Sequence, residues 1–233
     1  MSENLTVRNN SVEDVDVRVY ERKGDKVVHE MFVDCVRFTL SKLLTDEQIS
    51  TLPGIKVKRV HCPKAISTNA LGTSYYDGWT DEVVNSDLSV KDSNGDVADM
   101  VSFANELDKT GRHVISVRNG SINGGHSYRG IVDQLRTLVH EVVHVVQKHT
   151  GRLQCLIGRN SYGNLMNVSK VWEGKVKSSN DWVIQNDYYS QPWEGEAEFF
   201  QTTIRDEFLE SSDWSVEESG GVHNTVESLV SRG

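Results

Sequence analysis

Residues 138–147 read Leu-Val-His-Glu-Val-Val-His-Val-Val-Gln, and the interpretation of the whole chain starts from this stretch. It lies in an amphipathic pattern whose apolar residues recur at the spacing of one face of an α-helix. The apolar residues of this pattern are Ile131, Leu135, Leu138, Val139, Val142 and Val146. Gly151 follows Thr150, where a helix C-cap is expected. The pattern therefore predicts a long helix from Ile131 to about Thr150.

His140, Glu141 and His144 form an H-E-x-x-H sequence within this helix. Histidines four residues apart share one helix face, so both imidazoles can reach one metal ion at about 2.0–2.1 Å. Glu141 lies about 100° around the helix axis from His140, close enough to take a proton from a water bound to that metal. This arrangement suits metal-assisted hydrolysis, in which the metal also polarises the attacked carbonyl. The adjacent valines predict burial, which is costly for these polar groups unless they are paired with other groups or bound to a metal.

A catalytic zinc ion usually takes three protein ligands and leaves a fourth position for water. A second amphipathic helix, predicted from Pro192 to about Leu209, offers three candidate glutamates: Glu194, Glu196 and Glu198. Glu194 and Glu196 flank the apolar stripe of that helix at similar angles, so spacing alone leaves them tied. Glu194 falls at the third helical position, where a carboxylate can cap free N–H groups. We therefore predict Glu196 as the ligand and keep Glu194 and Glu198 as supporting residues or alternative ligands.

The stretch 138–147, followed by Pro-Trp-Glu-Gly-Glu-Ala-Glu at 192–198, resembles the gluzincin branch of the HExxH zinc metallopeptidases. It looks most like the small stand-alone metallopeptidases of bacteria and bacteriophages, which carry a V-W-x-G-K hairpin between the two helices, here at 171–175. The resemblance covers residues 111–209.

The resemblance implies His140 and His144 as zinc ligands, Glu141 as the general base and Glu196 as the third ligand. One position departs from the pattern. Thermolysin-like gluzincins carry an acidic residue four positions after the third ligand, and with Glu196 as that ligand the position is occupied by Phe200.

Peptidases of this type also stabilise the oxyanion that develops during hydrolysis with a Tyr or His donor. The candidates are Tyr188, Tyr189, His126 and His223, and the sequence does not choose among them. The segment His113–Val117 is placed where zincins have the edge strand that binds extended substrate by backbone pairing.

The rest of the chain alternates between strand and helix patterns. The further elements that we predict are strands at Val15–Tyr20, Ile55–Val60 and, turning at Gly174, Val168–Val176, with helices at Phe32–Leu44 and Ala98–Leu107 and a helical possibility at Val222–Val230. We expect an α+β, zincin-like fold in which the active-site helix packs on a small twisted mixed sheet and a second helix carries the third metal ligand. Residues 1–209 are predicted to form one domain with its catalytic core at 111–209, and 210–233 an acidic C-terminal appendage.

The 233 residues carry 34 acidic and 25 basic side chains, a formal net charge of −9. This balance argues against nucleic acid or an anionic membrane as the main partner, since both attract basic patches. The first residues lack the pattern of a secretory signal, and no apolar run reaches membrane-spanning length. Cys35, Cys62 and Cys155 are widely spaced and predict no disulfide framework. We therefore expect a cytoplasmic or virion-associated location.

The function that these features favour is a zinc-dependent hydrolase (cofactor Zn²⁺) that cleaves bonds in a peptide or protein substrate. Two alternatives remain open. The chain could be a zinc-binding structural or interaction module without turnover, or a zinc amidase that acts on cell-wall peptides.

Overall fold

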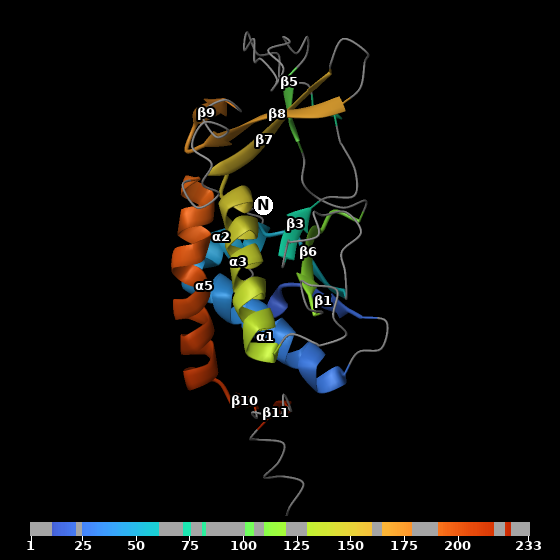
Figure 1. Ribbon diagram of the computed structural model, residues 1–233, viewed down its shortest axis with the longest axis vertical. Coiled ribbons are helices and arrows are strands. Elements are labelled where there is room, and N and C mark those ends of the chain that lie inside the picture. The colour runs from blue at the N-terminus through green and yellow to red at the C-terminus, as the bar shows by residue number, and fades with distance from the viewer. Residues whose placement is uncertain are drawn as a thin grey trace, which may run out of the picture.

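The computed structural model describes residues 11–21, 25–60, 72–75, 81–82, 101–104, 110–119, 130–159, 165–178, 191–216 and 222–224. Within them, three long helices combine with a four-stranded and a five-stranded sheet (Figure 1). The helices are α1 (Lys26–Leu43), α3 (Ile131–His149) and α5 (Pro192–Ser211). α3 lies between the four-stranded sheet and α5, so the element that carries the H-E-x-x-H sequence is the central helix of the fold.

The four-stranded sheet is mixed and has the strand order β1-β2-β6-β3. Its strands are β1 (Val17–Tyr20), β2 (Ile55–Val60), β6 (His113–Arg118) and β3 (Gly72–Tyr75). β1, β2 and β6 run parallel, and β3 pairs with β6 in the antiparallel sense. α1 and the short α2 (Asp46–Thr51) connect β1 to β2. Alternate residues of β2 are buried, as expected for a strand with one face against the helices.

The five-stranded sheet is antiparallel, has the order β4-β5-β7-β8-β9 and lies beyond the C-terminal end of α3 (Figure 1). Its strands are β4 (Asp81–Glu82), β5 (Val101–Ala104), β7 (Leu153–Arg159), β8 (Leu165–Trp172) and β9 (Lys175–Ser178). Gly151, with φ of 69°, ends α3 and lets β7 begin two residues later. Glu173 and Gly174 also have positive φ and form the tight turn between β8 and β9.

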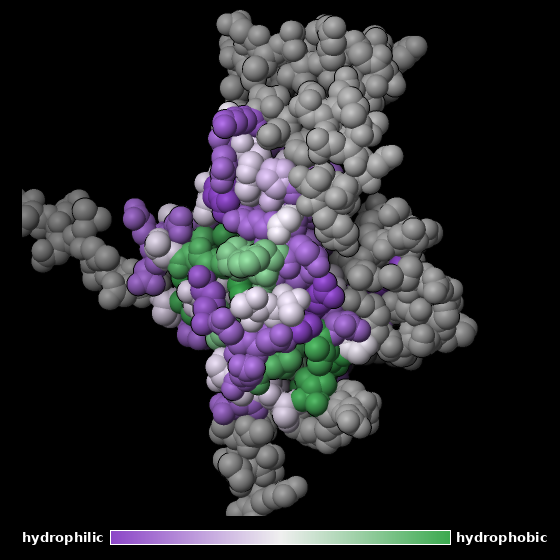
Figure 2. Space-filling model, turned by 60° about the vertical axis from the view of Figure 1, so that its left-hand side comes forward, coloured by the Kyte–Doolittle hydropathy of each residue, from purple (hydrophilic) through white to green (hydrophobic). Residues whose placement is uncertain are grey.

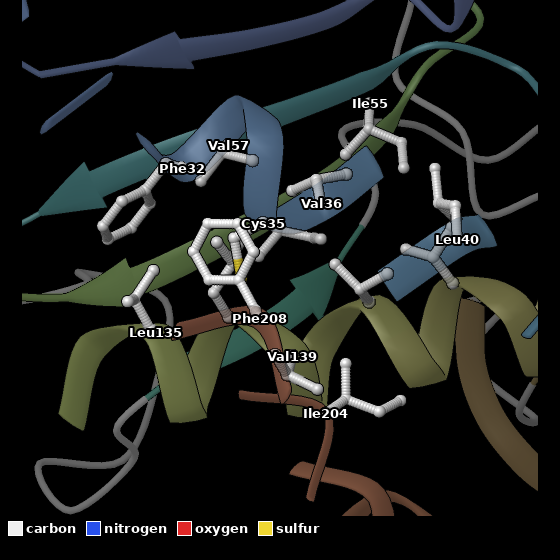
Figure 3. Close-up of a cluster of buried hydrophobic side chains, with 14 of the residues drawn as sticks. Phe32, Cys35, Val36, Leu40, Ile55, Val57, Leu135, Val139, Ile204 and Phe208 are labelled. Atoms are coloured by element: carbon white, nitrogen blue, oxygen red, sulfur yellow. The ribbon is translucent and has the colours of Figure 1, made fainter. Parts of the chain in front are cut away.

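The main hydrophobic core fills the space between the mixed sheet and the three long helices. Figure 3 shows side chains from α1, β2, α3 and α5 pointing toward one another there. The labelled members are Phe32, Cys35, Val36, Leu40, Ile55, Val57, Leu135, Val139, Ile204 and Phe208. Each of the ten is no more than 4% exposed. This core holds α3 and α5 side by side.

A hairpin follows α5 at the end remote from the five-stranded sheet (Figure 1). It comprises β10 (Trp214–Val216) and β11 (Val222–Asn224), and the 3-10 helix η1 (Val12–Asp14) packs nearby on α1. Trp214 is buried, and its Nε1 donates to Oδ2 of Asp34 at 2.9 Å. The first part of the predicted acidic appendage therefore contributes to the core, and the helical possibility from Val222 is wrong over the residues of β11.

Several predictions from the sequence are confirmed. β2 has the predicted bounds, α3 begins at Ile131, α5 begins with Pro192 at its first position, and β8 and β9 turn at Gly174. The small mixed sheet packed on the helix that carries the H-E-x-x-H sequence is also present. None of the described helices has the length and apolarity needed to cross a lipid bilayer.

Two predictions are wrong. Val101–Ala104, within the helix predicted at Ala98–Leu107, forms β5, because pairing with β7 satisfies its backbone groups. β6 contains the segment His113–Val117 that we placed at the sheet edge, but it pairs with β2 on one side and β3 on the other. The edge of the sheet beside β6 is therefore β3.

The packing of the core predicts that buried and exposed phenylalanines of α5 contribute differently to the stability of the protein. Phe208 is 1% exposed and packs on Phe38 with ring centroids 5.6 Å apart. Phe208→Ala is expected to lower the free energy of unfolding by about 3–5 kcal/mol because it leaves a cavity. Urea denaturation monitored by circular dichroism measures this loss.

Phe199→Ala is the matched control, since Phe199 lies on the same helix and is 71% exposed. Figure 2 shows one face of the molecule, on which hydrophobic areas lie among hydrophilic ones. We expect a loss of about 1 kcal/mol or less for this change. Equal losses for the two variants would contradict the packing described for α5.

Candidate metal centre

Two polar stripes meet where α3 packs against α5. The stripe on α3 contains Arg136, His140, His144 and Gln147, and the stripe on α5 contains Glu194, Glu198 and Gln201. The spacings of three and four residues place each set on one helix face. The two helices run antiparallel (Figure 1), so the early part of α3 meets the later part of α5, and the C-terminal part of α3 meets the start of α5.

His140, His144 and Glu194 bring three ligand atoms together at this seam. Nε2 of His140 and Nε2 of His144 are 3.2 Å apart, and each lies 3.3 Å from Oε2 of Glu194. The side chains are 12%, 9% and 7% exposed, respectively. The three atoms therefore form a nearly equilateral triangle in a largely dry part of the protein.

The size of this triangle fits a tetrahedral metal ion. Bonds of about 2.0–2.1 Å at tetrahedral angles separate neighbouring ligand atoms by roughly 3.3 Å. The two imidazole nitrogens and one carboxylate oxygen are also ligand types that divalent transition metals accept. The cluster could thus hold a metal ion with three protein ligands.

Glu194 owes its position to the start of α5. Pro192 occupies the first helical position, so Glu194 is the third, and its carboxylate lies in the first turn. The positive end of the helix dipole favours a negative charge there. Glu194 is 5% exposed and faces the histidines, so the residue that we predicted as a cap is the one that completes the cluster.

Glu196, which we predicted as the third ligand, lies elsewhere. Its Oε1 accepts from Nη1 of Arg152 at 2.9 Å, and its Oε2 accepts from Nε2 of Gln147 at 2.8 Å. The choice of Glu196 over Glu194 is therefore corrected. The tie was decided by assigning Glu194 to helix capping, whereas Glu194 and Gln201 are each 5% exposed because their side of α5 packs against the polar stripe of α3.

Glu198, the other alternative ligand, lies one turn further along α5 and accepts from Nη2 of Arg136 at 2.8 Å. Arg136 and Glu198 are each about two-fifths exposed, so this ion pair borders the cluster on the solvent side. Glu198 is close enough for its charge to affect His140.

The carboxylates around the cluster favour positive charge. Burial lowers the pKa of His140, but its hydrogen bond to Glu194 and the charges of Glu141, Glu194 and Glu198 outweigh this effect and raise the pKa above its ordinary value. The same charges favour a divalent cation. Burial raises the pKa of Glu141, against the opposing effect of His144 and His140. Glu141 is therefore a better proton acceptor than a solvent-exposed glutamate.

Of the four predicted oxyanion donors, one, His223, belongs to the residues that the structure describes. Tyr188, Tyr189 and His126 lie outside those residues. The backbone of His223 belongs to β11, which pairs with β10 beyond the last turn of α5. Because α5 rises by about 1.5 Å per residue, its far end is roughly 25 Å from Glu194, so the prediction of His223 as an oxyanion donor is wrong.

No protein-family model, curated protein or solved structure matches this chain.

Sequence reasoning missed Gln147 and Arg152, which hold Glu196 away from the cluster. The sequence could have indicated Gln147, because this residue follows His144 by three positions and so lies on the same face of α3. No sequence pattern indicated Arg152, because it is the turn between α3 and β7 that brings this residue to Glu196.

Metal analysis of two glutamate variants tests the ligand set. We expect the wild-type protein to bind one equivalent of zinc and Glu194→Ala to lose stoichiometric binding, because a direct ligand is removed. Glu196→Ala is expected to keep the ion but to bind it about 10–100-fold less tightly. A loss of this size is typical when the removed residue positions a metal ligand without binding the metal itself. Dialysis against zinc followed by mass-spectrometric metal analysis gives the stoichiometry. Full occupancy in Glu194→Ala together with loss in Glu196→Ala would contradict this ligand set.

Proposed function

We propose that this chain is a zinc-dependent peptidase in which His140, His144 and Glu194 hold the metal and Glu141 acts as the general base. The observation that carries the proposal is the triangle of ligand atoms, with sides of 3.2–3.3 Å, beside a buried glutamate that is not part of it. Zinc is the ion that best suits two histidines and a carboxylate in a tetrahedral arrangement.

The number of ligands favours a catalytic site over a structural one. Structural zinc sites usually close with four protein ligands, whereas catalytic sites use three and leave one position for water or substrate. The cluster contains three such residues among those that the structure describes. Glu141 provides the further group that hydrolysis needs and that a purely structural site does not.

The role of each protein group follows from its place. A zinc ion bound here would lower the pKa of a coordinated water and polarise the carbonyl of the substrate. Glu141 accepts the proton from the attacking water, and its raised pKa suits it to that role. Glu194 and the two histidines fix the direction of attack, because their own positions are set by the packing of α3 against α5.

Glu194 as the third ligand also removes the departure from the gluzincin pattern. The residue four positions after Glu194 is Glu198, so an acidic residue stands where thermolysin-like gluzincins carry one. In this chain Glu198 accepts from Arg136, and its negative charge raises the pKa of His140. The resemblance noted from the sequence is thus closer with the corrected ligand than with Glu196.

A peptide is the substrate class that the sheet favours. β3 is one of the two edge strands of the mixed sheet and lies against α3, the helix that carries both histidines. An extended peptide can add to such an edge through backbone hydrogen bonds. This supports cleavage within polypeptides, and the alternative of a cell-wall amidase becomes an outcome of the test.

Glu141→Gln is the decisive variant for catalysis. The change removes the general base but no metal ligand, so we expect zinc to stay bound while the rate of cleavage falls by about 10²–10⁴-fold. Cleavage is measured on denatured casein and, in parallel, on peptidoglycan. Glu210→Gln is the matched control, because Glu210 is exposed near the far end of α5, and it is expected to cleave at the wild-type rate.

The outcomes separate the proposal from its alternatives. Cleavage of peptidoglycan but not casein would favour an amidase. Zinc binding without cleavage of either substrate, unchanged in Glu141→Gln, would favour a structural or interaction module.

A further inference from the structure

The two histidines of the cluster differ in what their Nδ1 atoms contact. Nδ1 of His144 lies 2.8 Å from Oε1 of Gln147. Nδ1 of His140 is buried and has no hydrogen-bond partner among the described residues. Among the described residues, a hydrogen-bond partner at Nδ1 therefore positions the imidazole of His144 but not that of His140.

Gln147 can adopt only one amide orientation at this place. Its side chain is fully buried, and its Nε2 donates to the backbone oxygen of Trp193 at 2.9 Å and to Oε2 of Glu196 at 2.8 Å. Both hydrogens of the amide nitrogen are thereby used on acceptors, and Oε1 is left to face His144. An amide oxygen only accepts, so the hydrogen of this bond belongs to Nδ1 of His144.

The tautomer of His144 follows from this bond. A neutral imidazole with hydrogen on Nδ1 has its lone pair on Nε2. Nε2 of His144 is the atom that lies 3.2 Å from His140 and 3.3 Å from Glu194 in the triangle. The Nε2 lone pair of His144 is thus available for metal binding already in the metal-free protein.

Glu196 and Arg152 fix the position of the Gln147 side chain. Glu196 accepts from Gln147 with one oxygen and from Arg152 with the other. Arg152 also donates to Glu173 at 3.1 Å and lies over the ring of Trp172 at 4.8 Å. A continuous chain of polar contacts therefore runs from the turn between β8 and β9 to the buried histidine.

We propose that Gln147 is a positioning residue, which fixes the Nδ1–H tautomer of His144 and directs its Nε2 at the metal site, and that Glu196 and Arg152 hold the Gln147 amide in place. The inference rests on the metal site of the proposed function and does not depend on hydrolysis. Residues that support a metal-binding histidine in this way typically contribute about 10–100-fold in metal affinity.

The tautomer can be observed directly in the metal-free protein. Two-bond ¹H–¹⁵N correlation spectra, recorded where the imidazoles are neutral, distinguish Nδ1–H from Nε2–H histidines, and His144→Asn identifies the signal. We expect the Nδ1–H form for His144 in the wild-type protein. In Gln147→Met, which has similar length but no acceptor at that place, we expect the signal to shift toward the Nε2–H form.

Zinc affinity gives the second readout, measured by competition with a chelating dye. Gln147→Met is expected to bind zinc about 10–100-fold less tightly and to alter the visible spectrum of the cobalt-substituted protein. The double variant Gln147→Glu with Glu196→Gln restores an acceptor for Nδ1–H and a donor at position 196, but it has no donor for the backbone oxygen of Trp193. It is expected to recover part of the lost affinity.

Gln134→Met is the matched control, because Gln134 is also a buried glutamine of α3, and it accepts from Arg59 at 2.9 Å, away from the cluster. It is expected to lower stability without changing the tautomer or the affinity. An Nε2–H His144 in the wild-type protein overturns the proposal even if Gln147→Met does not fold. So does an equal loss of affinity in Gln134→Met, or none in Gln147→Met. Bound zinc without peptide cleavage would overturn the peptidase function and leave this inference standing.

Discussion

The burial of α3 is the constraint on which the site depends. α1, the mixed sheet and α5 surround this helix, so His140 and His144 lie where little water reaches them. Polar and charged groups in such a place are costly unless other groups compensate them. α5 supplies that compensation, since its first turn brings Glu194 within 3.3 Å of both imidazoles. A bound cation would compensate two imidazoles and a carboxylate so arranged still further.

The register between the two helices depends on the start of α5. Trp193 is 1% exposed and forms a small second core with Leu153 and Trp172 of the five-stranded sheet. The backbone oxygen of Trp193 also accepts from Gln147 on α3. The residue before Glu194 is therefore held by both neighbouring elements, and Glu194 has little freedom to move along α3. The five-stranded sheet thus contributes to the site without supplying a ligand to the cluster.

Much of the fold could be predicted because its signals are local. The apolar period of α3, the alternation of β2 and the proline that begins α5 each indicate an element within a few residues of sequence. β5 could not be predicted in this way, because its strand conformation depends on pairing with β7, more than fifty residues later in the chain. The edge position of β3 likewise depends on which strands meet, and no local pattern records it.

The site shows the same division at the level of single residues. The H-E-x-x-H spacing placed His140 and His144 together because four residues make about one helical turn. Which glutamate lies beside the histidines depends on which side of α5 faces α3. An apolar stripe alone does not determine that side when the facing helix is itself polar along one side. Comparison of the two polar stripes would have favoured Glu194, since Glu194, Glu198 and Gln201 repeat at the spacing of His140, His144 and Gln147. Where a buried helix carries a polar stripe, the residues that face it from the neighbouring helix are better predicted by matching the polar faces of the two helices than by the hydrophobic period of either one.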